Sequence, residues 1–384
     1  MTTITEKDIE ELRISGKIPI YKHGFPPEII NLYDDELVTL LGSANRSIGN
    51  INSYAKLVPN PDLLISPMLL KESLASSVIE GTQATEIDVI MDEAGEDLTP
   101  TLRLNTQEVI NHREATRLGQ KLIKQGEPIF SRTLKQIHHR LLSGVRGANL
   151  RRGEFREGSN IVTSEGTIDT AIYIPPRAEE VVGLMDKLDQ YINEALPERK
   201  EDPLIKAALI HHEFEAIHPF ADGNGRLGRT IISLYLLKQG VLEYPLLYVS
   251  GYLERNRNDY FNKLLEITTK GKRKEWIHFF LAGIEEQANR SRSILEEIYK
   301  LYKEHLAIVR ANISAGYVPQ LVEYIFKRPG MKAPDVAKEL KITHATALQA
   351  LRKMSELGIL QTLPQKRRNI PFYNSQLLDI LRKS

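Results

Sequence analysis

Helical signals dominate the pattern of apolar and polar positions along this chain. Asp202-Pro203 predicts a helix start, and the apolar positions that follow it continue until Pro219 ends the helix, because proline suits a first helical turn and disrupts a helix interior. A second, strongly apolar helix is expected over Gly225–Gln239. Ser66-Pro67 predicts the start of another helix, which runs to Glu80.

Strand signals are few. Asn160–Val162 and Ala171–Ile174 flank a polar turn that contains glycine, and together they predict one β-hairpin. From Tyr317 onward the pattern changes to three short helices and then two short strands around a basic tip. These segments are Pro319–Phe326, Ala333–Leu340, Thr343–Leu357, Leu360–Leu363 and Pro371–Tyr373, with Lys366–Arg368 as the tip. This order is typical of a winged helix-turn-helix. The predicted fold class is mainly α with one β-hairpin, plus a C-terminal winged helix domain.

Composition narrows the classes of protein that fit. The 384 residues are 41% hydrophobic and 26% charged, close to an average soluble globular protein. There is no cysteine, which excludes disulfides, thiolate metal sites and cysteine nucleophiles. No stretch approaches the roughly 18 apolar residues of a membrane span, and Met1–Glu10 lacks the character of a signal peptide. We expect a cytoplasmic protein with no membrane partner.

The net charge of +1 is distributed unevenly along the chain. Residues 317–384 hold twelve Lys or Arg against five Asp or Glu, a local charge of +7, so the remaining chain sums to −6. A basic terminal domain favours an anionic partner such as DNA, although a solvated basic face explains the charge equally well.

The run His218–Arg229 contains the residues best suited to chemistry. Its Gly-Asn-Gly turn, placed before a helix N-terminus, predicts an anion-binding site made of backbone N–H groups. Arg226 and Arg229 share a helical face and can bind phosphate oxygens in bidentate fashion. Asp222 is a hard oxygen ligand suited to Mg²⁺. His218 titrates near neutrality and is the natural general base.

Two other interpretations of this region fit less well. Gly223, Gly225 and Gly228 match the spacing of the dinucleotide-binding fingerprint, but a helix precedes them where that fingerprint requires a strand. His211 and His218 share a face, yet no carboxylate or thiolate completes a zinc site. We therefore interpret His211 and His212 as packed or surface histidines.

The run His-Pro-Phe-x-Asp-Gly-Asn-Gly-Arg-x-x-Arg resembles the signature of the Fic family, and all nine specified positions match. Most members of that family transfer AMP from ATP to a protein hydroxyl. Two further segments, Gly153–Arg156 and Ala171–Pro176, resemble the region around the family's β-hairpin flap, and Lys71–Thr82 resembles its N-terminal region. The similarity covers roughly residues 50 to 300.

The resemblance implies a role for each residue of the loop. His218 would deprotonate a Tyr, Ser or Thr hydroxyl of a target protein, including this chain itself, and pyrophosphate would leave. Asp222 would hold Mg²⁺ against the phosphates of ATP. The phosphate-binding groups would be Gly223, Asn224, Gly225, Arg226 and Arg229, the last on the γ-phosphate. The flap residues Asn160 and Ile161 would hold the target segment by strand-like pairing.

The resemblance also implies control of the activity. Ser76–Gly81 matches the family's inhibitory pattern, Ser/Thr-x-x-x-Glu-Gly/Asn. Glu80 would pair with Arg229 and so exclude the γ-phosphate, and Ser76, one turn earlier, would support it. The expected domains are an N-terminal helical region with the inhibitory helix, the catalytic core, a helical connector and the winged helix domain, over 1–100, 101–283, 284–316 and 317–384.

Two alternative functions stay open. In one, the site removes AMP from targets, with Glu80 positioning the attacking water. In the other, the chain is a DNA-binding regulator with a nucleotide-sensing core. There, the groove-facing residues would be Thr343, Thr346, Gln349 and Arg352. A second copy of the chain is a further partner that the sequence leaves open.

Overall fold

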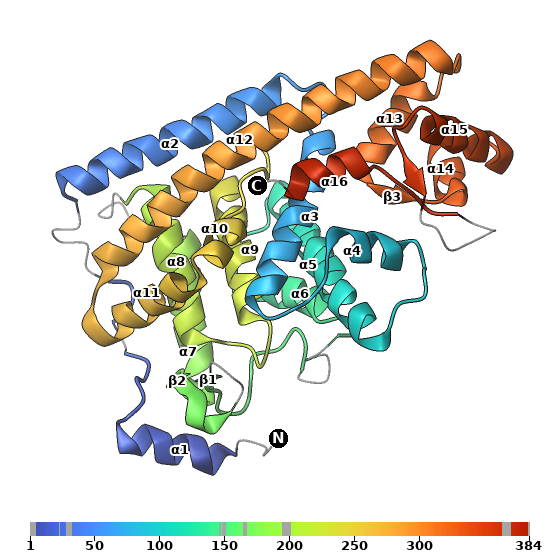
Figure 1. Ribbon diagram of the computed structural model, residues 1–384. Helices are drawn as coiled ribbons and strands as arrows, with labels where there is room; N and C mark the ends of the chain where they lie inside the picture. Colours follow the sequence, from blue (N-terminus) through green and yellow to red (C-terminus); the bar gives the residue numbers. More distant parts are fainter. Residues whose placement is uncertain are drawn as a thin grey trace. The chain divides into compact units, whose positions relative to one another are not determined.

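The computed structural model describes residues 5–22, 24–27, 33–145, 147, 151–163, 167–193, 201–362 and 370–382. It is mainly helical, as the sequence predicts (Figure 1). The chain divides into two compact units, each assembled from separate segments. The first contains Met1–Arg46, Glu114–Glu243 and Val249–Glu285, and the second contains Ser47–Arg113, Tyr244–Tyr248 and Glu286–Ser384. Sequence reasoning draws boundaries only along the chain, so the four continuous domains remain predictions.

Ten helices contribute described residues to the first unit, and α2, α5 and α12 also contribute to the second. They are α1 (Glu6–Ser15), α2 (Asp35–Lys56), α5 (Pro100–Lys124), α6 (Ser131–Leu141), α7 (Ala178–Asn193), α8 (Pro203–Ile217), α9 (Asn224–Lys238), α10 (Ser250–Arg255), α11 (Arg257–Lys270) and α12 (Arg273–Asn312).

The centre of the first unit is the pair α8 and α9, with α7 packed on α8 and α6 packed on α9. Helix α8 begins where the sequence predicts, because the side chain of Asp202 accepts a hydrogen bond from the N–H of Leu204. A Cβ atom at Gly228 on α9 would run into the side chain of Glu215 on α8. Close packing of α8 and α9 therefore favours glycine at this position. Gly228 is the third of the three glycines whose spacing resembles the dinucleotide-binding fingerprint.

The predicted hairpin is present in the first unit. β1 (Val162–Thr163) pairs antiparallel with β2 (Ala171–Tyr173), which follows the 3₁₀ turn η1 (Ile168–Thr170). The chain before α2 is tied to this hairpin, because the N–H of Tyr21 donates to the carbonyl of Ile174 over 3.1 Å. Glu6 on α1 accepts a hydrogen bond from the N–H of Ser159.

The second unit contains α3 (Asp62–Ile79) and α4 (Glu86–Glu93). Leu70 and Leu74 of α3 pack with Val89 and Val109 in a buried cluster. The predicted start of α3 at Ser66-Pro67 is wrong, because the helix begins four residues earlier and Pro67 lies inside it. The apolar burial of the helix on both sides of Pro67 offsets the backbone hydrogen bond that proline cannot make.

The C-terminal part of the second unit holds the three helices predicted there. Its elements are α13 (Val318–Lys327), β3 (Gly330–Met331), α14 (Ala333–Leu340), α15 (His344–Glu356), β4 (Gln361–Thr362), β5 (Phe372–Tyr373) and α16 (Ser375–Arg382). The strands form an antiparallel sheet in the order β3-β5-β4. Strand β3 and helix α16 have no counterpart in the sequence prediction. The basic tip Lys366–Arg368 lies outside the described residues, and the winged helix assignment stays a prediction.

This C-terminal part packs on the N-terminal helices of the same unit. α13 and α16 contact α3, and β3 contacts α4. Lys71 on α3 donates to the backbone carbonyl of Leu381 over 2.6 Å.

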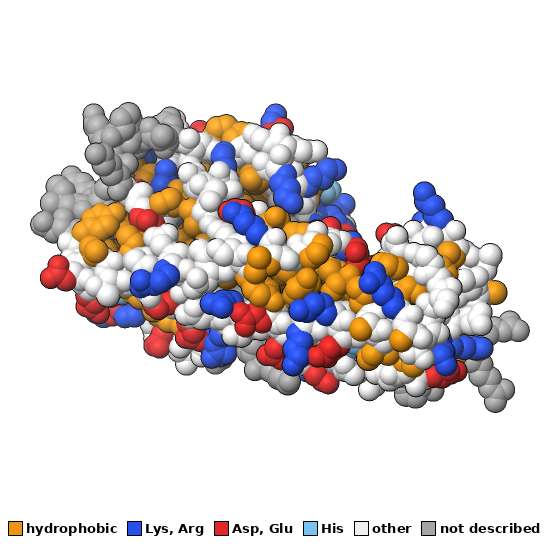
Figure 2. Space-filling model, turned by 90° about the horizontal axis from the view of Figure 1, so that it is seen from above, with side chains coloured by type: hydrophobic (Ala, Val, Ile, Leu, Met, Phe, Trp, Pro, Cys, Tyr) orange, Lys and Arg blue, Asp and Glu red, His pale blue; other side chains and the backbone are white. Residues whose placement is uncertain are grey.

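Basic and acidic side chains are mixed over the molecular face that Figure 2 shows. None of the helices in the described ranges has the length and hydrophobicity needed to span a bilayer.

Candidate active site

The candidate site is the loop between α8 and α9, and two residues with left-handed backbone conformations shape it. His218 ends α8 with φ 49° and ψ 60°, and Gly223 precedes α9 with φ 79° and ψ 7°. A positive φ is uncommon for residues other than glycine and is held in place by surrounding contacts. The loop therefore turns sharply at both ends. It brings the N-terminus of α9 close to the loop residues that follow His218.

His218 is held by contacts on both sides of its backbone and ring. The buried Arg156 donates from Nε to the carbonyl of His218 over 2.9 Å, and its other two nitrogens donate to the carbonyls of Gly158 and Pro176. The Nδ1 of His218 lies 3.4 Å from the carbonyl oxygen of Glu215. A carbonyl only accepts, so this contact favours the proton on Nδ1. The lone pair then lies on Nε2, as a general base requires.

Asn224 closes the loop from inside. Its Oδ1 accepts from the N–H of Phe220 over 2.9 Å, and its Nδ2 donates to the carbonyl of Phe220 over 2.8 Å. These two bonds occupy the amide of this buried side chain. The part of Asn224 suited to an anion is therefore its backbone N–H, which belongs to the first turn of α9, where N–H groups have no partner within the helix.

His138 on α6 is a site residue that sequence reasoning missed. Its ring stacks on Phe220 with 3.8 Å between centroids. Its Nε2 lies 2.9 Å from the carbonyl of Asp222, and its Nδ1 accepts from the N–H of Gly153 over 2.8 Å. Burial lowers the pKa of His138 to about 4, so the ring stays neutral and can make both bonds. No motif in the sequence marks this residue, because its partners lie 15 and 84 positions away.

We expect His138→Ala to loosen the loop. Two hydrogen bonds and one ring stack are lost, and losses of this kind typically destabilise a protein by roughly 2–4 kcal/mol. The melting temperature should fall, and amide hydrogen exchange should accelerate at Phe220 and Gly223. The exposed neighbour His139 is the matched control. Equal exchange in the His138→Ala and His139→Ala proteins would contradict this role for His138.

The charged residues of the signature gather at the start of α9. Arg226 and Arg229 are both buried, with 3% and 2% of their surfaces exposed. The Oδ1 of Asp222 accepts from the N–H of Gly223 over 2.5 Å and lies 3.4 Å from Nη2 of Arg226. The carboxylate of Asp222 and the guanidinium of Arg226 therefore lie beside the helix N-terminus, and the buried Arg229 follows one turn later on α9.

Asp222 fits the donor set of a magnesium ion. Its side chain is 36% exposed, and its Oδ2 makes no hydrogen bond with a described residue. That oxygen lies against Gly147, where a Cβ atom would crowd the carboxylate. One carboxylate oxygen is thus bound within the loop and the other is available, which suits a cation that usually takes one or two protein carboxylates together with phosphates.

The flap residues reach the same loop. Nδ2 of Asn160 lies 3.4 Å from the carbonyl of Phe220, and Asn160 and Ile161 are both half-buried immediately before β1.

Glu80 and Ser76 belong to the second unit. Glu80 is the exposed C-cap of α3, whereas Ser76 is fully buried one turn earlier. Pairing of Glu80 with Arg229 in the first unit stays a prediction.

The histidines before the loop differ from one another. His211 is fully buried, its Nε2 lies 2.9 Å from the hydroxyl of Tyr260, and its ring stacks on Tyr260 and Trp276. Burial lowers the pKa of His211 to about 3. This is the packed histidine that the sequence predicts. His212 lines a separate cavity.

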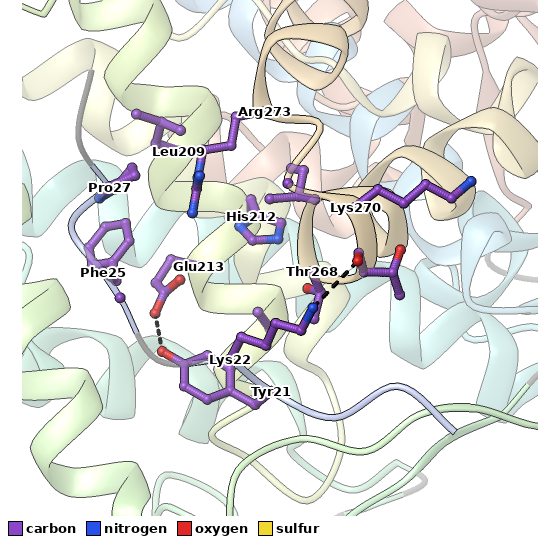
Figure 3. A pocket seen from close by; sticks show the side chains of 15 residues that line it. Tyr21, Lys22, Phe25, Pro27, Leu209, His212, Glu213, Thr268, Lys270 and Arg273 are labelled. Carbon is purple, nitrogen blue, oxygen red and sulfur yellow. Dashed lines mark hydrogen bonds between the residues drawn. The ribbon is translucent and has the colours of Figure 1, made fainter. Parts of the chain in front are cut away.

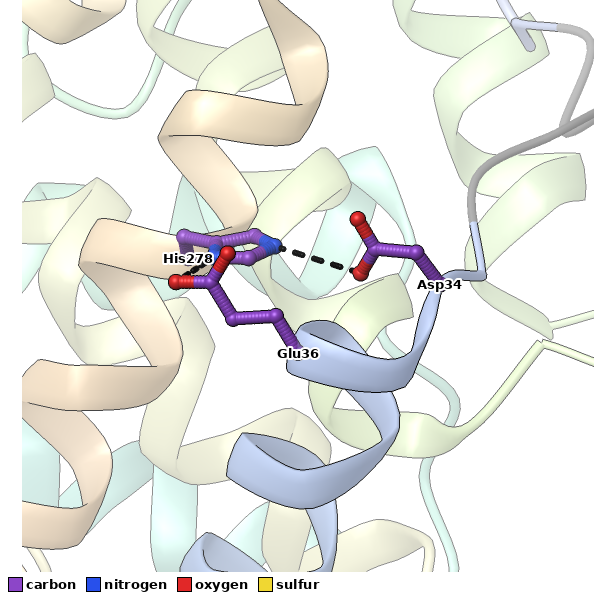
Figure 4. A group of neighbouring side chains, drawn as sticks. All are labelled: Asp34, Glu36 and His278. Atoms are coloured by element: carbon purple, nitrogen blue, oxygen red, sulfur yellow. Dashed lines mark ion pairs between the residues drawn. The ribbon is translucent and has the colours of Figure 1, made fainter.

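One group of acidic and histidine side chains among the described residues has the spacing of a metal site (Figure 4). Ligand atoms of Asp34, Glu36 and His278 lie within 4.8 Å of one another. However, Lys274 already pairs with Asp34 and holds the pKa of that carboxyl below its usual value. The group is best described as an ion-pair cluster between the start of α2 and α12.

Comparison with known proteins agrees with the geometry of the loop. The sequence model of the Fic/DOC family matches residues 128–236, which contain the loop. The model of the Fic/DOC family N-terminal region matches residues 38–121, which contain Ser76 and Glu80.

Curated relatives are named protein adenylyltransferase Fic. One from Culex quinquefasciatus is 27% identical over 158 residues, which cover 41% of this chain and 28% of the relative. One from Nematostella vectensis is 28% identical over 162 residues, 42% of this chain and 34% of the relative. The match thus spans about a third or less of the relatives' own length.

Solved structures share the fold. A Fic family protein from Desulfovibrio desulfuricans G20 has a TM-score of 0.55 at 21% identity, over 89% of this chain and 96% of that chain. Fic-1 from C. elegans has a TM-score of 0.51 at 18% identity, over 69% of this chain and 73% of that chain. The mainly helical fold of this chain is that of the Fic proteins.

Proposed function

Since this chain belongs to the Fic/DOC family, we propose that it is a protein adenylyltransferase, which transfers AMP from ATP to a Tyr, Ser or Thr hydroxyl of a protein. The observation that carries the proposal is the loop geometry. A half-buried histidine with its Nδ1 against a carbonyl stands at one end of a loop whose other end is an anion-binding helix N-terminus. A cytoplasmic location remains part of the same proposal.

The reaction follows from these positions. Nε2 of His218 accepts the proton of the target hydroxyl as the oxygen attacks the α-phosphorus of ATP. A new P–O bond forms, the bond from the α-phosphorus to the bridging oxygen breaks, and pyrophosphate leaves. Phosphoryl transfer of this kind depends mainly on positioning and charge stabilisation, and no covalent nucleophile of the protein is needed.

The start of α9 would stabilise the phosphates. Backbone N–H groups at Gly223, Asn224 and Gly225 and the guanidinium of Arg226 would bind oxygens, and Arg229 would bind the γ-phosphate. Asp222 would hold Mg²⁺, which when bound neutralises phosphate charge and orients the leaving group. Because both arginines are buried, their attraction to an anion is less screened than on a surface.

The hairpin would position the target. Asn160 and Ile161 lie between the loop and β1, and Asn160 already contacts the carbonyl of Phe220. An extended target segment could therefore pair beside β1 and present its hydroxyl to His218. This arrangement selects for accessible extended segments rather than for one sequence.

We further propose that the activity is autoinhibited through Glu80. The sequence pattern of Ser76–Gly81 supports this, and so does the match of the family's N-terminal region to this part of the chain. A carboxylate bound to Arg229 would occupy the guanidinium that the γ-phosphate needs. The same Glu80 could instead position a water that removes AMP from a modified target, which is the alternative function of the site.

Intact-mass measurement tests the proposed transfer. Candidate target proteins, and the chain itself, are incubated with ATP and Mg²⁺, and an added mass of one AMP is expected. Omission of ATP is the control. If neither the wild-type protein nor Glu80→Gly adds AMP to itself or to any protein of a cell extract, the proposed activity is wrong.

A DNA-binding regulator is the second candidate. Gln349 and Arg352 are exposed on α15, Thr346 on the same helix is half-exposed, and the exposed Thr343 is the N-cap of the helix. They form a polar face on a helix that lies in the +7 segment. This face is compatible with a nucleic acid groove, and it is equally compatible with a protein partner.

The salt dependence of binding distinguishes these partners. The 317–384 segment of the full chain should bind duplex DNA weakly at low salt and lose that binding steeply as salt rises, because its contacts would be mostly to phosphates. Fluorescence anisotropy of a labelled duplex measures this, with Arg352→Ala expected to weaken binding. Binding that is constant across salt concentrations, or absent at low salt, would point to protein docking instead.

A further inference from the structure

A cavity of about 300 Å³ lies in the first unit, apart from the loop (Figure 3). Three parts of the chain line it: a strap that contributes Tyr21, Lys22, Gly24, Phe25 and Pro27, one face of α8, and the end of α11 through Arg273. On α8 the lining residues are Leu209, His212, Glu213 and Ala216. This spacing places them on one helical face. None of the residues assigned above to the reaction lines this cavity.

The inner wall is polar and buried. Glu213 is 5% exposed, and its Oε1 accepts from the hydroxyl of Tyr21 over 2.5 Å (Figure 3). Its second oxygen makes no hydrogen bond with a described residue. Nε2 of His212 is also buried and has no hydrogen-bond partner in the described part of the chain. Buried polar atoms normally have partners, and those without one call for an explanation.

Near pH 7 the ring of His212 is neutral, whereas the carboxyl of Glu213 is protonated in about half of the molecules. Burial raises the pKa of Glu213 to about 7, although the Tyr21 hydrogen bond and the charge of Arg273 act in the opposite direction. Burial and then the charge of Arg273 lower the pKa of His212 to about 3. The inner wall therefore offers a neutral imidazole and a carboxyl that is only partly ionised near pH 7, and both can hydrogen-bond an uncharged polar group of a ligand.

The opening of the cavity is basic. Arg273 is exposed, and its guanidinium makes no ion pair or hydrogen bond with a described residue. Lys22 donates to the carbonyl of Thr269, and Lys270 pairs with Glu266. Among the described cations at this opening, Arg273 is therefore the one whose side chain is bound to no other group. A guanidinium in that state is suited to bidentate binding of a carboxylate or phosphate.

We propose that this cavity binds a small organic anion, with its carboxylate or phosphate on Arg273 and its uncharged polar end against His212 and Glu213. The apolar lining residues Phe25, Leu209 and Ile267 can pack against a ring-sized body of the ligand. The volume accommodates a molecule of one ring with its substituents rather than a peptide.

Binding would act on the flap through the strap. The strap begins at Tyr21, whose N–H donates to the carbonyl of Ile174, and Ile174 donates to the carbonyl of Pro19 over 2.9 Å. Ile174 directly follows β2. An occupant that contacts Tyr21 and Phe25 should therefore slow amide exchange at Tyr21 and Ile174, a readout that does not depend on any activity.

Titration calorimetry with simple probes tests the proposal on the full chain. 4-Hydroxybenzoate and 4-hydroxyphenyl phosphate carry the two anionic heads, and 4-hydroxybenzamide is the uncharged analogue. At least one anion should bind, the amide should bind at least about tenfold more weakly, and Arg273→Ala should weaken the anion by about tenfold or more, as loss of a charged hydrogen bond implies. Which head binds better identifies a carboxylate or a phosphate ligand.

Two controls distinguish binding in this cavity from binding at the His218–Arg229 loop. Arg257→Ala removes an exposed arginine of the same unit that does not line the cavity, and it should leave binding unchanged. Saturating ATP and Mg²⁺ should not displace the probe, so the result is independent of the proposed AMP transfer. Absence of binding for both anions, equal binding of the amide, unchanged affinity in Arg273→Ala, or displacement by ATP would each overturn the proposal.

Discussion

Replacing His218 with alanine should abolish AMP transfer while leaving nucleotide binding largely intact. The substitution removes the base but not the N-terminus of α9 or the arginines on it. Loss of a general base typically lowers the rate by roughly 10²–10⁴-fold. The rate is measured as labelled AMP incorporated over time, and ATP binding is measured separately by calorimetry. We expect the rate of AMP incorporation to fall sharply and the affinity for ATP to change little.

The exposed His139 provides the matched histidine control. His139→Ala should keep both transfer and binding, since this side chain does not contact the loop residues that bind nucleotide. Equal transfer rates for the wild-type protein and His218→Ala would contradict the proposed base. A loss of ATP binding in His218→Ala would show instead that the ring serves mainly to shape the loop, whose backbone is left-handed at this position.

Replacing Glu80 with glycine should raise AMP incorporation, including self-modification, because Arg229 is then available for the γ-phosphate. Arg229→Ala in the same background should cancel most of the gain, since the released partner is absent. Labelled AMP incorporation over time in the wild type, the two single variants and the double variant measures both effects. Non-additivity in this cycle distinguishes relief of one ion pair from general loosening of the second unit.

The direction of the chemistry is tested with the same variants. If Glu80 positions a water for AMP removal, Glu80→Gly should lose that activity on a modified target while it gains transfer. A neighbouring control is Val78→Ala, an exposed change in the same helical turn, which should alter neither rate. Incorporation by Glu80→Gly no higher than that of the wild type would mean that Glu80 is only the end of a helix.

The sequence by itself determined the elements whose signals are contiguous. Asp202-Pro203 predicts the start of α8 because its capping contact joins residues two apart. The loop from His218 to Arg229 could be interpreted from its own residues, since glycines, a helix start and charged side chains follow one another directly. The hairpin and the three C-terminal helices were predictable for the same reason, namely that period and turn residues are local properties.

The tertiary structure decided what depends on residues far apart in the chain. The support of the loop by His138, the anchoring of His218 by Arg156, and the start of α3 before Pro67 follow from packing, which sequence patterns do not record. The cavity at Glu213 is lined by residues from three separate parts of the chain, so no local sequence motif predicts it. Short-range preferences set where helices begin and end, whereas burial and hydrogen bonding between distant segments decide which side chains meet.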